Sequence, residues 1–455
     1  MKYINLRLIL ITVLALSISF SCRKTDVANH TQTIGTNDSL SPSALKDSSL
    51  SYTRNLYLWY DQIPSTFNAQ AYADPAALMQ AIHQYSNEPG FSAPVDRWSF
   101  GIKKADWDNM SAGMSSTVNS SGDFGLSVFF RAQGDLRVRL VEPNSPAAAA
   151  GIQRSWRITA INGQNNITTS NANYIVNSVY YSNSGAFTFI KPDGSTVNIT
   201  LNAVHYVEQP VYMSQVYSVN GQNIGYLVFN SFLGDTTQIY NDLQRVFNDF
   251  ASQGVTKLIV DLRYNGGGYV SVQEKMADYL APQSANGQMM FKETYNNKNS
   301  QYNLTTYFHK LGPLNLSKIY FIVTTSTASA SELLINNLKP YMDVTLVGPS
   351  TTHGKPVGFF PVPVGSWYVF PVSFRSTNSR GEGNYFNGMP VDLSASDGLD
   401  HDWGLGESCL SAVLSGIGNG TLSRQQAPPA TAVEIPVITQ SNQQLDEPHF
   451  KGMLK

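Results

Sequence analysis

Residues 319–355 restrict the possible folds of this chain more than any other stretch of its sequence. The stretch begins with an apolar run at 319–323, which has the length and the β-branched composition of a buried strand. Small hydroxyl-bearing residues dominate 324–331, and residues 332–338 then show the apolar spacing of a helix. Another short strand is predicted at 344–347, followed by a glycine-containing loop. This alternation of strand, turn, helix and strand predicts an α/β fold.

The small-residue turn has the chemistry of an acyl-transfer site. Ser329 is predicted at the N-terminus of the helix, where unpaired N–H groups and the helix dipole stabilise the oxyanion that forms when a carbonyl is attacked. Lys355 follows 26 positions later (355 − 329). It can act as a base only if desolvation or a nearby cation lowers its pKa from about 10.4 toward 7. In the alternative interpretation, Ser329 and Ser331 only cap the helix and Lys355 is a solvated loop residue.

A glycine-rich turn is a second candidate part of the site. Residues 258–262 have the composition of a buried strand, and the sequence Arg-Tyr-Asn-Gly-Gly-Gly follows at 263–268. Glycine allows the backbone to approach a substrate closely and to adopt positive φ. Taken by itself, a glycine triplet after a strand also fits a plain turn.

These motifs together resemble peptidase family S41, the carboxyl-terminal processing proteases. The resemblance rests on TASASE at 327–332, Gly-Lys at 354–355 and Asp-Leu-Arg-x-Asn-Gly-Gly at 261–267. It implies a crotonase-like α/β core of sheet and helices at 208–420, with Ser329 as the nucleophile and Lys355 as the general base. The oxyanion-hole donors that it implies are the N–H groups of Gly268, with Gly267 as the second choice, and of Ala330.

The surroundings of Lys355 contain one departure from the family and two rival motifs. The family commonly has Gln four residues after the lysine, whereas this chain has Phe359, an apolar neighbour that would still desolvate Lys355 and lower its pKa. Residues 348–355 nearly match a phosphate-binding loop, but five residues separate the glycines where four are needed, and Pro356 stands where Ser or Thr is required. His353 is the alternative base of a Ser-His-Asp set, and we assign it to loop packing.

Residues 113–207 resemble a PDZ domain. The strongest fingerprint is VEPNSPAAAAGI at 141–152, and residues 158–163 have the pattern of a strand that ends in an Asn-Gly turn. Before that strand the family has Gly-Asp where this chain has Ser155-Trp156, a change that affects the turn more than the fold.

The PDZ resemblance implies a peptide-binding loop. Backbone N–H groups around Gly125, Leu126 and Ser127 would hold the C-terminal carboxylate of a ligand, while the ligand adds a strand to the sheet. The alternative is that Gly125 only relieves a tight turn.

The first 22 residues predict export from the cytoplasm. Lys2 and Arg7 precede an apolar run at 8–20, which is shorter than the roughly 20 residues that a bilayer-spanning helix needs. Cys22 follows, and its setting resembles a bacterial lipoprotein processing site that would make it the lipid anchor. The alternative is a secreted protein that loses Cys22 with its signal peptide.

Three further segments complete the predicted organisation. Residues 23–45 are polar and lack periodicity, as a flexible tether would be. Residues 46–112 predict a small helical N-terminal domain, in which Pro75 suits the first turn of a helix. Residues 421–455 form a Pro-rich tail, and its stretch at 425–440 is expected to be disordered or loosely docked.

Composition excludes several classes of function. The formal net charge is −2 and charged residues are only 14% of the chain, so nothing indicates a nucleic-acid partner. The seven histidines show no paired ligand spacing, so we expect neither a metal site nor a cofactor.

The sequence therefore predicts a serine endopeptidase with a Ser-Lys dyad, whose PDZ domain recognises polypeptide substrates by their apolar C-terminal ends. The expected location is the cell envelope, with the lipid anchor holding the protein to the membrane on the periplasmic side or on the outer-membrane surface. One alternative is a catalytically inactive, peptide-binding lipoprotein, which Phe359 favours. Another is a crotonase-type acyl-CoA enzyme, which would leave the PDZ fingerprint unexplained.

Overall fold

The computed structural model of the chain describes residues 40–114, 121–316, 318–420, 441–442, 445 and 452–455. The predicted signal segment, including Cys22, and the tether up to residue 39 lie outside these residues. In the part of the chain that is described, no helix is long and apolar enough to cross a lipid bilayer.

A six-stranded sheet lies at the centre of the α/β core. It contains β7 (Val211–Val219), β8 (Gln222–Phe229), β9 (Val255–Asp261), β13 (Lys318–Ile322), β14 (Asp343–Gly348) and β19 (Leu393–Ser394). The strand order is β19-β14-β13-β9-β8-β7, and only β7 and β8 pair antiparallel. The predicted strands at 319–323 and 344–347 are β13 and β14, so the parallel unit expected from the sequence is present.

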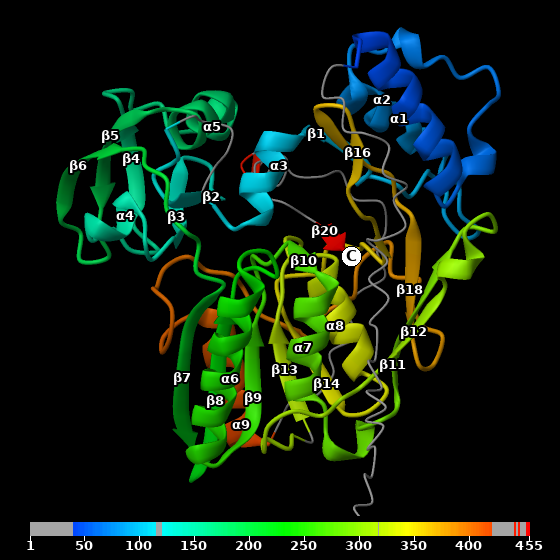
Figure 1. Cartoon of the computed structure of the whole chain (residues 1–455). Coiled ribbons are helices and arrows are strands. Elements are labelled where there is room, and N and C mark those ends of the chain that lie inside the picture. Colours follow the sequence, from blue (N-terminus) through cyan, green and yellow to red (C-terminus); the bar gives the residue numbers. More distant parts are fainter. Residues whose placement is uncertain (1–39, 115–120, 317, 421–440, 443–444, 446–451) are drawn as a thin grey trace, which may run out of the picture. The chain divides into compact units, whose positions relative to one another are not determined.

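Helices cover both faces of this sheet (Figure 1). One face carries α6 (Thr236–Ser252), α7 (Val270–Leu280) and α8 (Ala330–Leu338), and the other carries α9 (Ser408–Asn419). Side chains alternate along β8, because successive residues of a strand point to opposite faces. Leu227 and Phe229 join the cluster under α6 to α8, whereas Tyr226 and Val228 join the cluster under α9.

The N-terminal region contains α1 (Pro42–Leu56), α2 (Pro75–Ile82), β1 (Phe100–Lys103) and α3 (Lys104–Ser111). The predicted tether is therefore wrong at its end, since α1 begins at Pro42. Ser41 caps this helix by accepting a hydrogen bond from Ala44 N–H at 3.2 Å, and a proline at the first helical position fits because its N–H is not needed there.

The N-terminal region is not purely helical, and it shares its hydrophobic core with the C-terminal half of the chain. Strand β1 pairs antiparallel with β17 (Trp367–Phe370), which in turn pairs with β16 (Val362–Val364). One cluster contains Trp59, Leu78 and Trp98 together with Phe359 and Phe370.

Two smaller sheets complete this half of the molecule. One contains β12 (Leu304–Tyr307), β11 (Met289–Tyr295), β18 (Phe374–Asn378) and β15 (Val357–Gly358). The other pairs β10 (Gly267–Tyr269) in parallel with β20 (Gly452–Leu454). Residues 452–454 of the tail are therefore paired with the glycine-rich turn, whereas the Pro-rich stretch at 425–440 lies outside the described residues.

A separate antiparallel sheet fills much of the region 121–207. It contains β2 (Leu126–Ala132), β3 (Asp135–Val141), β4 (Arg157–Ile161), β5 (Ser184–Ile190) and β6 (Thr196–Asn202), in that order, with α4 (Pro146–Ala149) and α5 (Ala172–Tyr180) beside it. This region has its own hydrophobic core.

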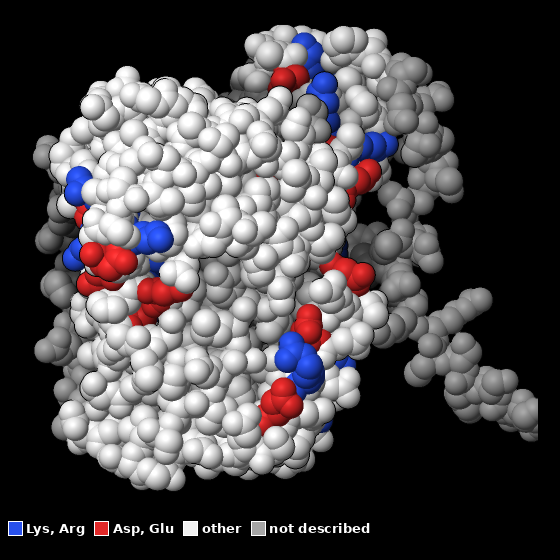
Figure 2. Space-filling model, turned by 90° about the vertical axis from the view of Figure 1, so that its left-hand side faces the viewer, with Lys and Arg blue, Asp and Glu red and all other residues white. Residues whose placement is uncertain are grey.

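A buried ionic network joins that region to the α/β core. Arg154 donates to Asp397 at 2.6 Å, and Asp397 also accepts from Arg263 at 3.0 Å. Arg263 lies immediately after β9 and pairs further with Asp261 and Glu407. By contrast, the face in Figure 2 carries only scattered charged side chains of both signs.

Candidate active site

Ser329 lies at the turn between β13 and α8, at the N-cap position of the helix. Its backbone has φ +59° and ψ −108°, a conformation that a residue with a side chain adopts only when the surrounding structure imposes it. The side chain is fully buried, and its Oγ has no hydrogen-bond partner among the described residues. The turn thus holds the buried hydroxyl of Ser329 at the positive end of a helix, where no other described residue forms a hydrogen bond with it.

Glu332 connects the two predicted catalytic residues. Its Oε2 accepts hydrogen bonds from the main-chain N–H of Ser329 and of Lys355, both at 2.8 Å. Its Oε1 accepts from Thr352 Oγ1 at 2.6 Å and from Gly354 N–H at 2.7 Å. Burial raises the pKa of Glu332, while these four bonds oppose the rise by favouring the carboxylate. Ser329 and Lys355, which are 26 positions apart in the sequence (355 − 329), therefore donate their main-chain N–H groups to the same oxygen atom.

The sequence interpretation missed Glu332, although a signal for it was present. Ser-x-x-Glu is the spacing at which a residue in the first turn of a helix accepts the N–H of the N-cap residue. Here the side chain of Glu332 accepts the N–H of Ser329, as in a capping box, but the hydroxyl of Ser329 forms no hydrogen bond in return with a described residue.

Lys355 is fully buried, and burial lowers its pKa well below the ordinary value. Asp96 and Glu332 act in the opposite direction, because their negative charges favour the ammonium form. The ring of Phe359 lies 3.6 Å from Nζ, and the ring of Trp98 lies 5.8 Å from it. The apolar environment that the sequence predicted from Phe359 is therefore present.

Asp96 and Trp98 come from the N-terminal region, and no local sequence signal marks them as part of this site. Asp96 accepts hydrogen bonds from Tyr57 Oη at 2.8 Å and from Ser99 Oγ at 2.6 Å, which fixes the turn that carries Trp98. Only the tertiary pairing of β1 with β17 brings this turn to Lys355.

His353 packs in the loop before Lys355. Its Nε2 accepts a hydrogen bond from Trp98 Nε1 at 3.0 Å, and its Nδ1 lies 3.2 Å from the carbonyl oxygen of Thr325. A neutral ring protonated at Nδ1 satisfies both contacts, so both nitrogens are engaged away from Ser329.

The predicted oxyanion donors meet next to Ser329. Gly267 and Gly268 both have positive φ, +106° and +139°, and a Cβ on Gly267 would lie 3.0 Å from the amide nitrogen of Ala330. The N–H of Gly267 already donates to Asn265 Oδ1 at 2.9 Å. Gly268 pairs with Met453 in the β10–β20 ladder. Of the two glycines, Gly268 is thus the one whose amide is not committed to Asn265.

The residues predicted to bind a peptide carboxylate lie at the start of β2. The N–H of Gly125 donates to Asp123 Oδ1 at 2.7 Å, so a carboxylate of the chain itself takes that donor. Ser127 Oγ accepts two hydrogen bonds from the buried Arg139, at 2.7 and 3.0 Å. Leu126 pairs with Val141.

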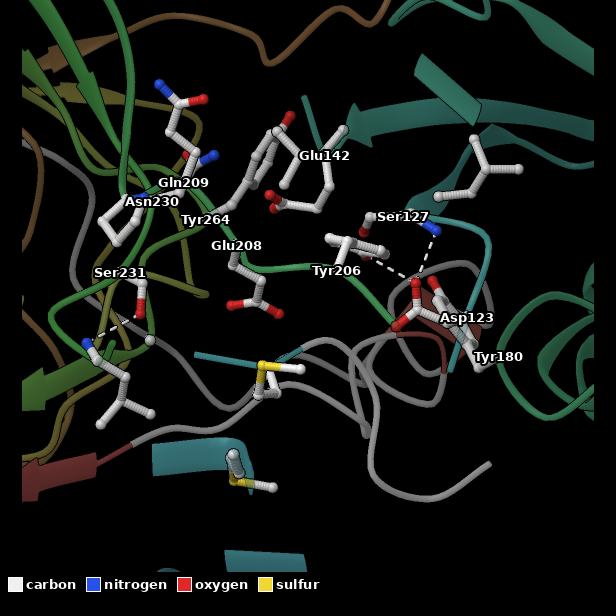
Figure 3. Close-up of a pocket in the computed structure, with 18 of the residues that line it drawn as sticks. Asp123, Ser127, Glu142, Tyr180, Tyr206, Glu208, Gln209, Asn230, Ser231 and Tyr264 are labelled. Carbon is white, nitrogen blue, oxygen red and sulfur yellow. Dashed lines mark hydrogen bonds between the residues drawn. The ribbon is translucent and has the colours of Figure 1, made fainter. Parts of the chain in front are cut away.

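A pocket extends from this loop to the glycine-rich turn. Its lining includes Gly125 and Ser127 on one side and Gly266 and Gly267 on the other. Figure 3 shows that acidic side chains line it, among them Asp123, Glu142 and Glu208. The two sets of residues that the sequence predicted separately thus border one cavity.

The pocket holds carboxyl groups of unusual pKa. Burial, reinforced by the charge of Asp123, raises the pKa of Glu142 to about 7. Burial likewise raises the pKa of Glu208 well above its ordinary value, and the charges of Glu142 and Asp123 add to the effect. In the described part of the chain, including this pocket, no group of three or more His, Cys, Asp or Glu side chains is arranged to hold a metal ion.

Comparison with known proteins agrees with this geometry. The family model for peptidase family S41 matches residues 223–381, a span that contains Ser329, Lys355 and the glycine-rich turn. A carboxyl-terminal-processing protease of Picosynechococcus is 28% identical over 303 residues, covering 61% of this chain and 66% of the relative. The carboxy-terminal processing protease CtpB of Bacillus subtilis is 26% identical over 238 residues, covering 51% of this chain and 46% of the relative.

One crystal structure is similar over most of the chain. It is described as an S41 protease from Bacteroides fragilis, with 25% sequence identity and a TM-score of 0.67, and the match covers 82% of this chain and 97% of that one. The matches to the curated relatives, by contrast, span between about half and two thirds of their length. The mixed α/β fold is thus that of S41 proteases, and residues 223–381 match the model of peptidase family S41.

Proposed function

We propose that the chain is a serine endopeptidase that cleaves polypeptides with a Ser329–Lys355 dyad. The observation that carries the proposal is the joint environment of the two side chains. Ser329 has a buried hydroxyl with no hydrogen-bond partner in the described part of the chain, and Lys355 is buried and has a lowered pKa. The main-chain N–H groups of both residues bind the same oxygen of Glu332.

The proposed reaction begins when the neutral amine of Lys355 takes the proton of Ser329 Oγ, which attacks the scissile carbonyl. The N–H groups of Ala330 and Gly268 stabilise the resulting oxyanion. Lys355 then returns the proton to the departing amine, leaving an acyl-enzyme. Water attacks the ester with the same lysine as base, which releases the acid product and restores the hydroxyl of Ser329.

The test compares Ser329→Ala and Lys355→Ala with the unchanged chain on a disordered protein, with fragments identified by mass spectrometry. Each substitution is expected to lower kcat/KM by at least about 10⁴-fold, since removal of a nucleophile or its base leaves only binding and oxyanion stabilisation. Circular dichroism checks that each variant remains folded. Retained cleavage by Lys355→Ala would assign the base to another group.

The second candidate is a catalytically inactive peptide-binding protein. Phe359 favours it, because its ring lies against the amine where the family commonly has a Gln side chain. In that case the purified chain binds peptides, no fragments form, and Ser329→Ala changes nothing.

We further infer that residues 113–207 act as a PDZ domain that selects apolar C-terminal ends, and that the protein works in the cell envelope, held by lipid on Cys22. The first inference is supported by the sheet β2 to β6 and by the pocket that begins at Gly125. It predicts that peptides ending in an apolar residue bind more tightly than their C-terminally amidated forms, as measured by fluorescence anisotropy.

The second inference rests on the sequence 1–22. It predicts that Cys22→Ala abolishes metabolic labelling with palmitate and releases the protein from membranes.

A further inference from the structure

The described tail residues contact two places, the sheet that begins with β2 and the glycine-rich turn, and the glycine-rich turn lines the pocket in Figure 3. Ser441, Asn442 and Leu445 lie against the sheet that begins with β2, and residues 452–455 lie against the glycine-rich turn. Figure 1 shows β20 beside β10. Both contacts have the form that a bound peptide would have.

The first contact is to the outer edge of β2, which is the edge strand of its sheet. The side-chain amide of Asn442 accepts a hydrogen bond from Phe130 N–H at 2.7 Å and donates one to the Phe130 carbonyl at 2.9 Å. These are the two bonds that the peptide group of an added strand would make. Leu445 is fully buried in the hydrophobic cluster that also contains Phe130 and Ile175 of α5.

The second contact places a strand between the glycine-rich turn and Phe359. Gly452 N–H donates to the Gly266 carbonyl at 3.0 Å. On the other side, Phe359 N–H donates to the Met453 carbonyl at 3.0 Å, and Lys455 N–H donates to the Phe359 carbonyl at 3.3 Å. Residues 452–455 are therefore hydrogen-bonded on both edges.

The side chains of this strand alternate between two clusters. Met453 is fully buried in the cluster under α6 to α8, and Leu454 is buried in the cluster that contains Phe359. Lys455 forms an ion pair with the buried carboxylate of Glu293.

The carbonyl oxygen of Gly452 lies beside the proposed oxyanion site. A Cβ on Gly267 would overlap this oxygen and would lie 3.0 Å from the amide nitrogen of Ala330. A carbonyl group of an extended strand is thus close to both the glycine-rich turn and the amide of Ala330.

We propose that the described tail residues are a resident peptide ligand of this chain, which occupies the substrate path and competes with the polypeptide to be cleaved. This inference rests on the proposed peptidase function. The substrate then enters as an extended strand parallel to β10, its scissile carbonyl takes the place of the Gly452 carbonyl, and two apolar residues follow it into the positions of Met453 and Leu454. Cleavage requires that residues 452–455 leave.

The binding test needs no catalysis. In the Ser329→Ala chain, deletion of residues 452–455 is expected to tighten the binding of a fluorescein-labelled peptide with the sequence 441–455. If the resident strand fills its site nine-tenths of the time, the apparent affinity rises about tenfold, because only the open fraction binds. Equal affinity for the intact and shortened chains, with both folded, would overturn the proposal.

The activity test uses the chain with Ser329 intact. Deletion of 452–455 is expected to raise kcat/KM on a disordered protein, and the free 441–455 peptide is expected to raise KM without changing kcat. Loss of activity that the added peptide restores would instead make the strand a permanent part of the catalytic fold. Tighter peptide binding without cleavage by any variant would refute the peptidase and leave the resident ligand standing.

A measurement on the undeleted chain covers the case in which the shortened chain does not fold. In Ser329→Ala, a saturating disordered substrate is expected to speed hydrogen exchange at the amides of Gly452 and Lys455, which are both bonded in the resident state. Unchanged protection under saturation would overturn the proposal. As a control, the exposed Leu405 is replaced by Asp, which leaves both the exchange and the binding as they are.

Discussion

At the scale of single residues, Glu332 links the main chains of the two proposed catalytic residues. Its carboxylate accepts four hydrogen bonds in a fully buried position, two of them from the main chains of Ser329 and Lys355. A carboxylate can do this because both of its oxygens are acceptors.

Replacement of Glu332 by Gln should therefore damage both stability and activity. One end of the amide is an NH2 group, which would face N–H donors and leave them unpaired. We expect the free energy of unfolding to fall by about 2–4 kcal/mol, as for other broken buried polar networks. We expect kcat/KM to fall on the order of 10²-fold through misplacement of the dyad. Urea unfolding and cleavage of a disordered protein measure the two effects, and Glu382→Gln, at an exposed position, is the control. A fully stable Glu332→Gln would contradict the assigned role.

Ser155 is a residue whose replacement should stabilise the chain. It has φ +79°, its side chain is buried, and its Oγ has no hydrogen-bond partner among the described residues. Ser155→Gly removes both the strained backbone and the unpaired hydroxyl, so we expect the free energy of unfolding to rise by about 1 kcal/mol. Ser155→Ala removes only the hydroxyl and should gain less. A glycine variant that is less stable than the alanine variant would refute this explanation.

At the scale of elements, the strand–turn–helix–strand unit that carries the dyad could be predicted from local sequence. Apolar runs mark β13 and β14, and small residues mark the turn before α8, because period and composition follow from which face of an element is buried. The same holds for β9 and the glycine-rich turn. The bond from Gly267 N–H to Asn265 Oδ1 is also local, because an Asn side chain commonly accepts from the N–H two residues further on, although the sequence interpretation did not use this signal.

The part of the site that could not be predicted comes from distant segments. The turn at 96–98 reaches Lys355 through the pairing of β1 with β17, and β20 reaches β10 from the end of the sequence. Pairing between strands so far apart leaves no periodic signal in either segment. Proline content predicted a loose stretch at 425–440 only, and no local signal predicted that Met453 and Leu454 would be buried.

The turn at 96–98 predicts how activity depends on pH. In the proposed mechanism the neutral amine of Lys355 is the active form, so kcat/KM should rise with pH through the lowered pKa of this residue. Trp98→Ala should admit water to the amine, which raises the pKa of Lys355 toward its ordinary value. The rising limb of the plot of kcat/KM against pH then moves to higher pH. Each unit of the shift costs about tenfold in rate at a pH below the limb. Trp98→Phe keeps a ring in place and should move the limb less. An identical profile for Trp98→Ala would show that Trp98 does not control the desolvation of Lys355.

At the scale of the whole described molecule, opposing charge effects act where the β2–β6 sheet meets the α/β core. The network of Arg154, Asp397 and Arg263 holds the two together, because each charge is paired. Glu142 and Glu208 destabilise the folded state once they ionise, since they are desolvated and lie near Asp123 in the same pocket.

The stabilising contribution of these two carboxyl groups should therefore fall between mildly acidic and neutral pH. A carboxyl group whose pKa is raised in the folded state stabilises that state fully below the pKa of the unfolded chain, and this contribution is lost as pH rises through the folded value. For Glu142 the window runs from about 4.5 to about 7. We expect the stability gained by Glu142→Gln, measured by urea unfolding, to grow by about 1–2 kcal/mol from pH 5 to pH 8. Glu382→Gln should show no such trend, and a flat difference for Glu142→Gln would exclude this pocket as the cause.

The shared anchoring of Ser329 and Lys355 on one carboxylate has a consequence for control of the enzyme. The main-chain N–H groups of both residues bind one oxygen of Glu332, so their main chains cannot separate without breaking the start of α8. We therefore expect the proposed dyad to keep its main-chain spacing in every molecule. Regulation of the proposed activity must then act on the entry of the substrate. A small mechanism-based inhibitor does not need an opening wide enough for a polypeptide strand. It should therefore react with every molecule, including those that a large polypeptide cannot enter.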